Sequence, residues 1–148
     1  MTNTQLTALQ LAQQFMNAFA GRNPEAAAAL LAEDATLTIA LGIDGSPTPW
    51  YFFDGQTQVR GYIEAVAAKF DRVAFLDQEW HASMDGRTAF MEARGDILSS
   101  AEGLEYRNVY VFKIEVSDGL VARVTEYANP VTYANLGIKD SETEAAAR

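Results

Sequence analysis

The sequence predicts an α+β fold in which three N-terminal helices pack on one strongly bent, mainly antiparallel sheet. In the N-terminal half, apolar residues recur at spacings of three and four, as in amphipathic helices. From residue 75 onward, runs of alternating, β-branched and aromatic residues are separated by Asp-Gly turns, which is typical of consecutive antiparallel strands. The 148 residues suffice for one domain, which we place at residues 1–138, with a polar, disordered tail at 139–148.

The three helices are predicted from apolar periodicity and from capping residues. The first is expected over residues 4–20, and its apolar face consists of Leu6, Leu9, Ala12, Phe15, Met16 and Phe19. Gly21 ends this helix, and Asn23-Pro24 begins an alanine-rich second helix that extends to Ala32. A third helix is expected over residues 59–70, with one side formed by Tyr62, Ile63, Val66 and Phe70.

The strands are predicted from alternation and turn residues. Two are expected between the second and third helices, at residues 35–41 and 50–53, with a loop rich in glycine and proline between them. The third helix is followed by strands 75–84 and 87–98, which the turn Asp85-Gly86 joins. The last two strands lie between Leu104 and Pro130, and a short segment with Tyr133 and Leu136 follows.

The hairpin around Ser117-Asp118-Gly119 places one carboxylate on an apolar face. With a three-residue loop, Val116 pairs with Leu120 and Tyr110 pairs with Glu126. One face then carries Asn108, Tyr110, Phe112 and Ile114 on one strand and Leu120, Ala122, Val124, Glu126 and Ala128 on the other. A two-residue loop would set Glu126 opposite Val111 and mix apolar with polar residues, so the segregated pattern favours the first register.

An apolar surrounding suits Glu126 to proton transfer. Burial disfavours an ionised carboxyl, so the pKa of Glu126 should rise toward neutrality, as a general acid or base at pH 7 requires. The alternative is that Glu126 lies at the rim of the sheet and reaches water. In the first case, Glu126 lies in a cavity lined by Tyr110, Phe112, Val124 and helix residues. Tyr110 and Asn108 could then hydrogen-bond the carboxyl group or a bound carbonyl.

Further polar and aromatic candidates lie on the other strands. In strand 87–98, Arg94 and Asp96 share a face, which either lines a polar pocket or is a solvated, salt-bridged surface. His81 shares a predicted face with Phe75, Asp77, Glu79 and Ser83, so it is either a surface residue or a proton carrier. Trp50 begins an aromatic run, Trp50 to Phe53, which serves either as core or as a ligand platform.

Composition excludes several classes of function. The net charge of −9 argues against nucleic acid and anionic membranes as partners, because both need a basic face. The chain has no cysteine and one histidine, and no glycine-rich phosphate loop follows a strand, so we expect neither a metal nor a cofactor. No apolar run approaches the roughly 20 residues that span a bilayer. We therefore expect a cytoplasmic protein.

Several short motifs resemble the SnoaL-like and ketosteroid-isomerase-like branch of the nuclear-transport-factor-2-like superfamily, and most of all the phenazine biosynthesis A and B proteins. They lie between about Leu41 and Ile138 and are Glu79-Trp80-His81, Ala93-Arg94-Gly95-Asp96-Ile97-Leu98, Glu102-Gly103-Leu104-Glu105-Tyr106, Glu126-Tyr127-Ala128-Asn129-Pro130 and Leu136-Gly137-Ile138. The resemblance implies a cystatin-like α+β roll with a conical cavity between sheet and helices. It also implies that Glu126 is the acid/base group and that His81 shares its pocket.

Other members of the superfamily match less well. Arg94-Gly95-Asp96 resembles the Arg-x-Asp motif of limonene-epoxide-hydrolase-like proteins, but the Tyr and Asn that those proteins need on the first strand are replaced by Leu37 and Ile39. The first-helix Tyr of the steroid isomerases is matched by Phe15, and their first-strand Asp by Ile39. The resemblance therefore argues against ketosteroid isomerisation and weakens the case for epoxide hydrolysis.

These observations lead to one functional prediction with alternatives. We expect a cofactor-independent isomerase, cyclase or condensation catalyst for a hydrophobic ring compound, in which Glu126 transfers the proton. His81 or Asp96 would be its counterpart, Arg94 would orient a substrate carboxylate or carbonyl, and Phe15 and Trp50 join the lining. The alternatives are a non-catalytic binding or scaffolding domain and an epoxide hydrolase. A homodimer is expected through the second face of the last hairpin, which consists of Val109, Val111, Thr125 and Tyr127.

Overall fold

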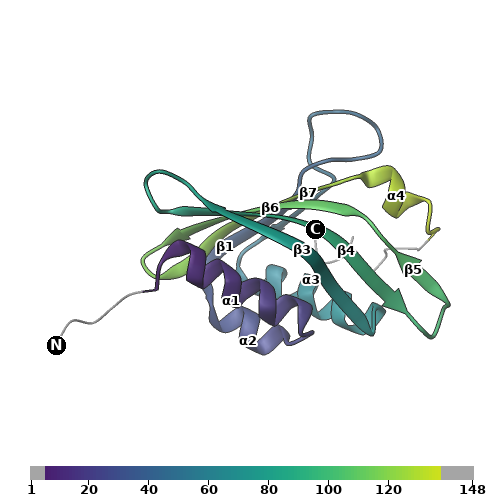
Figure 1. Ribbon diagram of the computed structural model, residues 1–148, viewed down its shortest axis with the longest axis horizontal. Coiled ribbons are helices and arrows are strands. Elements are labelled where there is room, and N and C mark those ends of the chain that lie inside the picture. The colour runs from purple at the N-terminus through teal and green to yellow at the C-terminus, as the bar shows by residue number, and fades with distance from the viewer. Residues whose placement is uncertain (1–5, 138–148) are drawn as a thin grey trace.

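The predicted α+β architecture is observed in the computed structural model, which describes residues 6–137 (Figure 1). The elements are α1 (Ala8–Ala20), α2 (Pro24–Ala29), β1 (Leu31–Ile39), β2 (Tyr51–Asp54), α3 (Gln56–Lys69), β3 (Arg72–Ala82), β4 (Thr88–Ser99), β5 (Leu104–Tyr106), β6 (Val109–Ser117), β7 (Leu120–Ala128) and α4 (Pro130–Ala134). The first helix begins later than expected, because Thr7 caps it and pairs reciprocally with Gln10. The predicted tail at 139–148 lies outside the described residues.

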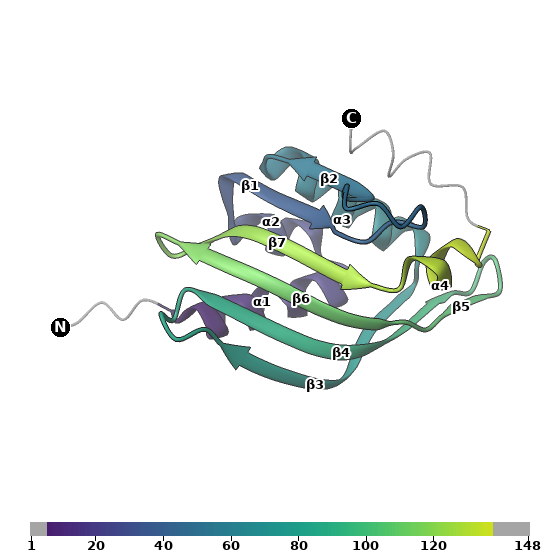
Figure 2. The same cartoon turned by 90° about the horizontal axis from the view of Figure 1, so that it is seen from above.

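One curved sheet carries all seven strands. Its order is β2-β1-β7-β6-β4-β3, and β5 pairs with the end of β4. The pair β1–β7 is parallel and the other pairs are antiparallel. Helices α1, α2 and α3 cover one face of the sheet, whereas the other face carries no helix in the part of the chain described (Figures 1 and 2). The inner face is therefore the only side on which the sheet and helices can enclose a core.

The predicted register of the β6–β7 hairpin is wrong, although the predicted face of Glu126 is right. The turn has two residues, Asp118 and Gly119, which both have positive φ values, 53° and 75°. A bulge between Glu115 and Val116 then leaves Ala122 unmatched, so that Glu126 pairs with Phe112 and Tyr110 with Ala128. The shorter turn and the bulge each shift the pairing by one residue, and together they return Glu126 to the face of Phe112. The bulge also turns Val121 inward, where Leu120 and Ala122 were expected.

A second bulge, in β3, changes the face expected for Phe75. Asp77 has a φ of 54°, and Leu76 pairs with Arg94 while Glu79 already pairs with Glu92. The extra residue places Phe75 and Trp80 on the same, inner side, so Phe75 does not share a face with His81 as predicted. The alternation predicted for β4 is confirmed, because its inward residues, Ala89, Met91, Ala93, Gly95 and Ile97, are all buried.

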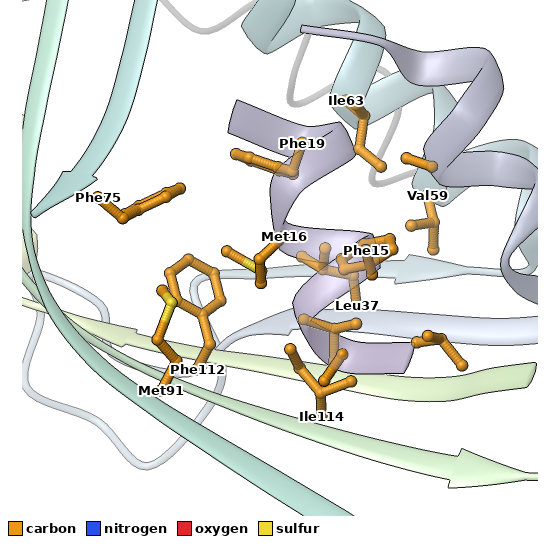
Figure 3. Packing of buried hydrophobic residues seen from close by; sticks show 14 of the residues in the cluster. Phe15, Met16, Phe19, Leu37, Val59, Ile63, Phe75, Met91, Phe112 and Ile114 are labelled. Carbon is orange, nitrogen blue, oxygen red and sulfur yellow. The ribbon is translucent and has the colours of Figure 1, made fainter. Parts of the chain in front are cut away.

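The core lies between α1, α3 and the inner face of the sheet (Figure 3). Phe15 and Met16 on α1 point toward Leu37, Phe112 and Ile114, and all five side chains are at most 2% exposed. The aromatic rings of Phe75 and Phe112 meet edge to face, with centroids 5.4 Å apart. This packing fills one end of the space under the sheet. The other end, toward α4 and β5, remains partly open.

Candidate functional site

A cavity of about 70 Å³ lies under the sheet at the end where α3, β5 and α4 meet. Its lining is mostly aromatic and includes five of the six tyrosines in the chain. The lining residues are Phe19, Ile39, Leu41, Trp50, Tyr51, Tyr62, Val66, Lys69, Phe70, Phe75, Ile97, Tyr106, Tyr110, Glu126, Ala128, Asn129, Pro130 and Tyr133. Pockets for drug-sized ligands usually measure about 300–1,000 Å³, so this cavity suits a small molecule or one ring of a larger one.

Glu126 is the one carboxylate among these lining residues. It lies on a central strand, between Ile39 of β1 and Phe112 of β6, and it is only 9% exposed. Burial raises its pKa to about 7 from an ordinary value of 4.5. None of the residues described here donates a hydrogen bond to its carboxyl group. The predicted placement of Glu126 is therefore confirmed, whereas its role in proton transfer stays a prediction.

Tyr110 lies in the cavity wall because Gly95 leaves room for its ring. A Cβ atom at Gly95 would lie 2.4 Å from Cε2 of Tyr110, which no side chain could occupy without displacing the ring. Phe75 packs edge to face against the same ring, with centroids 5.3 Å apart. Burial, the nearby carboxyl of Glu126 and hydrogen bonding with Tyr106 raise the pKa of Tyr110, so its hydroxyl remains protonated at neutral pH.

Aromatic residues and one lysine form the end of the cavity near α4. Trp50 stacks on Tyr51, with centroids 5.3 Å apart, and meets Tyr133 edge to face at 5.9 Å. Lys69, at the C-terminal end of α3, donates a hydrogen bond of 3.2 Å from Nζ to the hydroxyl oxygen of Tyr133. The cavity thus has a carboxyl group on the sheet side and a cation on the helix side.

Four other predicted lining residues do not reach the cavity. Phe15, Phe112 and Val124 are fully buried in the core, where they support the lining from behind. Asn108 is also buried, but its side chain contacts Tyr106 and Asn129 and does not face the cavity. Of the predicted substrate-binding residues, only Tyr110 and Trp50 line the cavity that contains Glu126.

Arg94 and Asp96 lie on the outer face of the sheet, away from Glu126. The guanidinium of Arg94 forms an ion pair with Asp77, and both side chains are largely exposed. Asp96 lies 3.0 Å from Arg72 and 3.5 Å from Arg107. They point outward because the residues between and beside them in β4 fill the inner face. The salt-bridged surface, which was one of the two interpretations of this face, is what the structure contains.

His81 is not brought to the cavity either. It is exposed on β3 and pairs with Phe90, on the opposite side of the strand from Trp80. The pocket that the resemblance implied for His81 together with Glu126 is therefore not formed in this structure.

The sequence reasoning missed several residues that the structure places around the cavity. They are Lys69, Tyr106 and Tyr133. A signal was present for two of them. Tyr106 continues the inward alternation of Asn108 and Tyr110, and Lys69 follows Tyr62 and Val66 at helical spacing.

The structure shows no arrangement that would hold a metal ion among residues 6–137, where His, Asp and Glu form no group of three or more. In the same range no helix has the length and apolar character needed to cross a membrane.

Comparisons with known proteins agree with this architecture. The model of the SnoaL-like domain matches residues 12–124, about three quarters of the chain. The uncharacterized protein YesE of Bacillus subtilis (strain 168) is 27% identical over 99 residues, which cover 67% of this chain. The matched region spans 65% of YesE, slightly less than two thirds of its length.

Solved structures share the fold at low identity. A proposed isomerase from Bacillus subtilis has a TM-score of 0.72 and 24% identity, covering 86% of this chain and 90% of that one. A proposed polyketide cyclase from Pseudomonas putida KT2440 has a TM-score of 0.70 and 24% identity, with 88% and 97% covered. A phenazine biosynthesis-related protein from Pseudomonas aeruginosa has a TM-score of 0.66 and 18% identity, with 89% and 90% covered. At these identities the likeness shows the fold alone.

The bent sheet, the three covering helices and the cavity between them define the chain as a protein with the NTF2-like fold. Within that class, the chain belongs to the SnoaL-like domain family.

Proposed function

We propose that this protein is a cofactor-independent acid/base catalyst that isomerises or cyclises a small ring compound. The observation that supports this most directly is the placement of Glu126. It is buried, it faces an aromatic cavity and its pKa is about 7, so both protonation states are populated under neutral conditions. The family, and the similarity to a proposed isomerase and a proposed polyketide cyclase, point in the same direction.

The chemistry that Glu126 can perform is proton transfer at carbon. The ionised carboxylate removes a proton from the carbon next to a carbonyl group, and the electron pair of that C–H bond moves to give an enolate. In an isomerisation, the carboxylic acid returns the proton at another carbon. In a cyclisation, the enolate carbon instead attacks a second carbonyl of the same molecule, and the resulting alkoxide takes the proton. The aromatic lining packs against the ring.

Proton exchange on a simple ketone tests this proposal without the natural substrate. In D₂O, the protein should accelerate the replacement of α-protons by deuterium in 2-cyclohexenone, followed by the loss of their ¹H NMR signals. The variant Glu126→Gln keeps the shape of the side chain but cannot accept the proton, so exchange should slow by roughly 10²–10⁴. Glu79→Gln, at an exposed carboxylate on β3, is the matched control and should retain the wild-type rate. Equal exchange rates for the wild type and Glu126→Gln would refute the proposal.

One observation favours a second candidate, a binding domain without catalysis. His81, Asp96 and Arg94 lie outside the cavity, so within residues 6–137 the lining offers Glu126 no second carboxylate or histidine as a partner. A binding domain would take up 2-cyclohexenone, seen as a rise in the melting temperature, without accelerating its exchange. Glu126→Gln would then change affinity modestly and alter no rate.

A further inference from the structure

Asn108 lies at a break in the sheet, between the end of β5 and the start of β6. It is 6% exposed, and its backbone carbonyl accepts a hydrogen bond of 2.8 Å from the N–H of Gly95. Its side chain reaches across to Asn129, which follows the last residue of β7. Asn108 therefore joins two strand ends at the point where β5, β6 and α4 surround the cavity.

The hydrogen bonds of the Asn108 amide fix its orientation. The oxygen Oδ1 accepts from the backbone N–H groups of Val109, at 2.8 Å, and Asn129, at 3.2 Å. Because both of these partners can only donate, Nδ2 must be the donor on the opposite side. It donates to the hydroxyl oxygen of Tyr106, at 2.6 Å, and to the backbone carbonyl of Asn129, at 2.9 Å. The side chain thus uses both of its donors and both lone pairs of its oxygen.

Both groups that Nδ2 contacts belong to the cavity wall. Tyr106 lines the cavity and is hydrogen-bonded to Tyr110, which faces the cavity near Glu126. Because the contact with Tyr106 raises the pKa of Tyr110, Tyr110 is its donor, and the hydroxyl oxygen of Tyr106 accepts from both Asn108 and Tyr110. Asn129 also lines the cavity and caps α4, because its side chain accepts from the N–H of Val131.

We propose that Asn108 is a positioning residue of the candidate site, which holds the Tyr106–Tyr110 hydroxyl pair and the start of α4 in place from behind. When a ligand binds, the hydroxyl of Tyr110 would turn from Tyr106 and donate its hydrogen bond to an oxygen atom of the ligand. The chemical class of ligand that fits is a ring compound with a carbonyl oxygen that becomes an enolate during proton transfer by Glu126. This inference rests on the proposed function for its catalytic part, and on hydrogen bonding alone for its structural part.

Two variants separate the parts of the Asn108 interaction. Asn108→Leu has a similar size and no polar atom. Asn108→Asp keeps the acceptor oxygens but, when ionised, loses both donors. Asn17→Asp adds the same charge at an exposed position on α1 and is the control. Protein labelled with ¹³Cζ-tyrosine reports on each hydroxyl by NMR, with resonances assigned through single Tyr→Phe variants.

The resonances of Tyr106 and Tyr110 should move together in both Asn108 variants, while that of Tyr51 stays unchanged. Acidification should move the Tyr106 resonance of Asn108→Asp part of the way back, because a protonated carboxyl can donate again. The control should show no such change. A role in stability alone would lower the melting temperature and leave the Tyr110 resonance in place, and that result overturns the proposal. If Asn108→Leu does not fold, Asn108→Asp carries the same test.

The catalytic part is tested on 2-cyclohexenone exchange. In the Asn108 variants, misplacement of the Tyr110 hydroxyl should lower kcat by about 10-fold to 100-fold, with KM nearly unchanged. A change in KM alone would overturn the role of Tyr110 in transition-state binding. If Tyr110 moves in the NMR experiment but the wild-type protein exchanges no protons, Asn108 is a positioning residue as proposed, and the failure belongs to the proposed function.

Discussion

At the scale of single residues, Glu126 couples the candidate site to the stability of the fold. Its pKa is about 7 in the folded protein, whereas an unfolded chain would ionise it near 4.5. The folded state therefore binds this proton more tightly than the unfolded state does. The resulting gain in unfolding free energy is fully present below pH 4.5. It is lost as pH rises from 4.5 through 7, because folding then opposes ionisation. The pKa difference between the folded and unfolded states corresponds to about 3 kcal/mol of unfolding free energy.

Glu126→Gln should remove this pH dependence. Relative to the variant, the wild-type protein should lose about 3 kcal/mol of unfolding free energy between pH 4.5 and pH 8. Urea unfolding at the two pH values measures the difference. Glu92→Gln, at an exposed carboxylate on β4, should follow the wild type. Parallel pH profiles for the wild type and Glu126→Gln would mean that the carboxyl group is hydrated in the folded state.

Gly95 offers a second test at the same scale. Gly95→Ala places a methyl group where the ring of Tyr110 lies, and that ring is already packed against Phe75. The substitution should lower the unfolding free energy by about 1–3 kcal/mol. In a Tyr110→Leu background the same change should have much less effect, because the ring is absent. A double-mutant cycle on urea unfolding measures this coupling, and additive effects would contradict the packing described.

At the scale of elements, the β6–β7 hairpin directs Glu126 into the cavity. Its turn needs positive φ values at Asp118 and Gly119, which an L-residue other than Asn, Asp or Gly adopts only with strain. Gly119→Ala should therefore reduce stability by about 1 kcal/mol. Asp118→Gly removes a side chain at the neighbouring position and should have a smaller effect. Both are measured by urea unfolding. A Gly119→Ala protein as stable as the wild type would argue against this turn.

The same hairpin shows what the sequence could and could not predict. The face of Glu126 follows from the alternation of apolar residues, which two compensating one-residue shifts leave intact. The bulges themselves carry no local signal, since Ala122 and Asp77 stand in ordinary strand sequences. Because the β3 bulge was not foreseen, Phe75 was predicted to lie on the wrong face of its strand.

The composition of the cavity was the least predictable feature. Motifs near Arg94 and His81 indicated chemistry, but the alternation in β4 directs Arg94 outward. The β3 bulge, which cannot be read from a short motif, places His81 on the outer side as well. Lys69 and Tyr133 are far apart in sequence and meet only because α3 and α4 end at the same edge of the cavity. Such long-range contacts leave no pattern in the intervening residues.

At the scale of the whole molecule, the face of the sheet that no helix of residues 6–137 covers carries exposed apolar residues. Val109, Val111 and Tyr127 are 62%, 36% and 40% exposed on this face, close to the ion pair of Arg94 and Asp77. Apolar residues gathered on a sheet surface are typical of an interface. We expect that a second copy of the chain covers them, in a two-fold symmetric dimer that buries about 800 Å² per subunit.

Sedimentation velocity at tens of micromolar checks this expectation. The wild type should sediment as a dimer and Val111→Glu as a monomer, because a charge at the centre of the interface would be buried without a partner. Met84→Glu makes the same chemical change at a fully exposed position in the β3–β4 turn and should remain dimeric. A monomeric wild-type protein would refute the interface.

The aromatic end of the cavity has an optical consequence. Only two tryptophans are present in the chain, and Trp50 lines the cavity whereas Trp80 does not. Tyr51 and Tyr133 lie within 6 Å of Trp50 and will transfer excitation energy to it. In a Trp80→Phe protein, ultraviolet emission would come from Trp50 alone. A molecule that enters the cavity would then change the intrinsic fluorescence of Trp50, so unlabelled protein can be screened against collections of ring compounds.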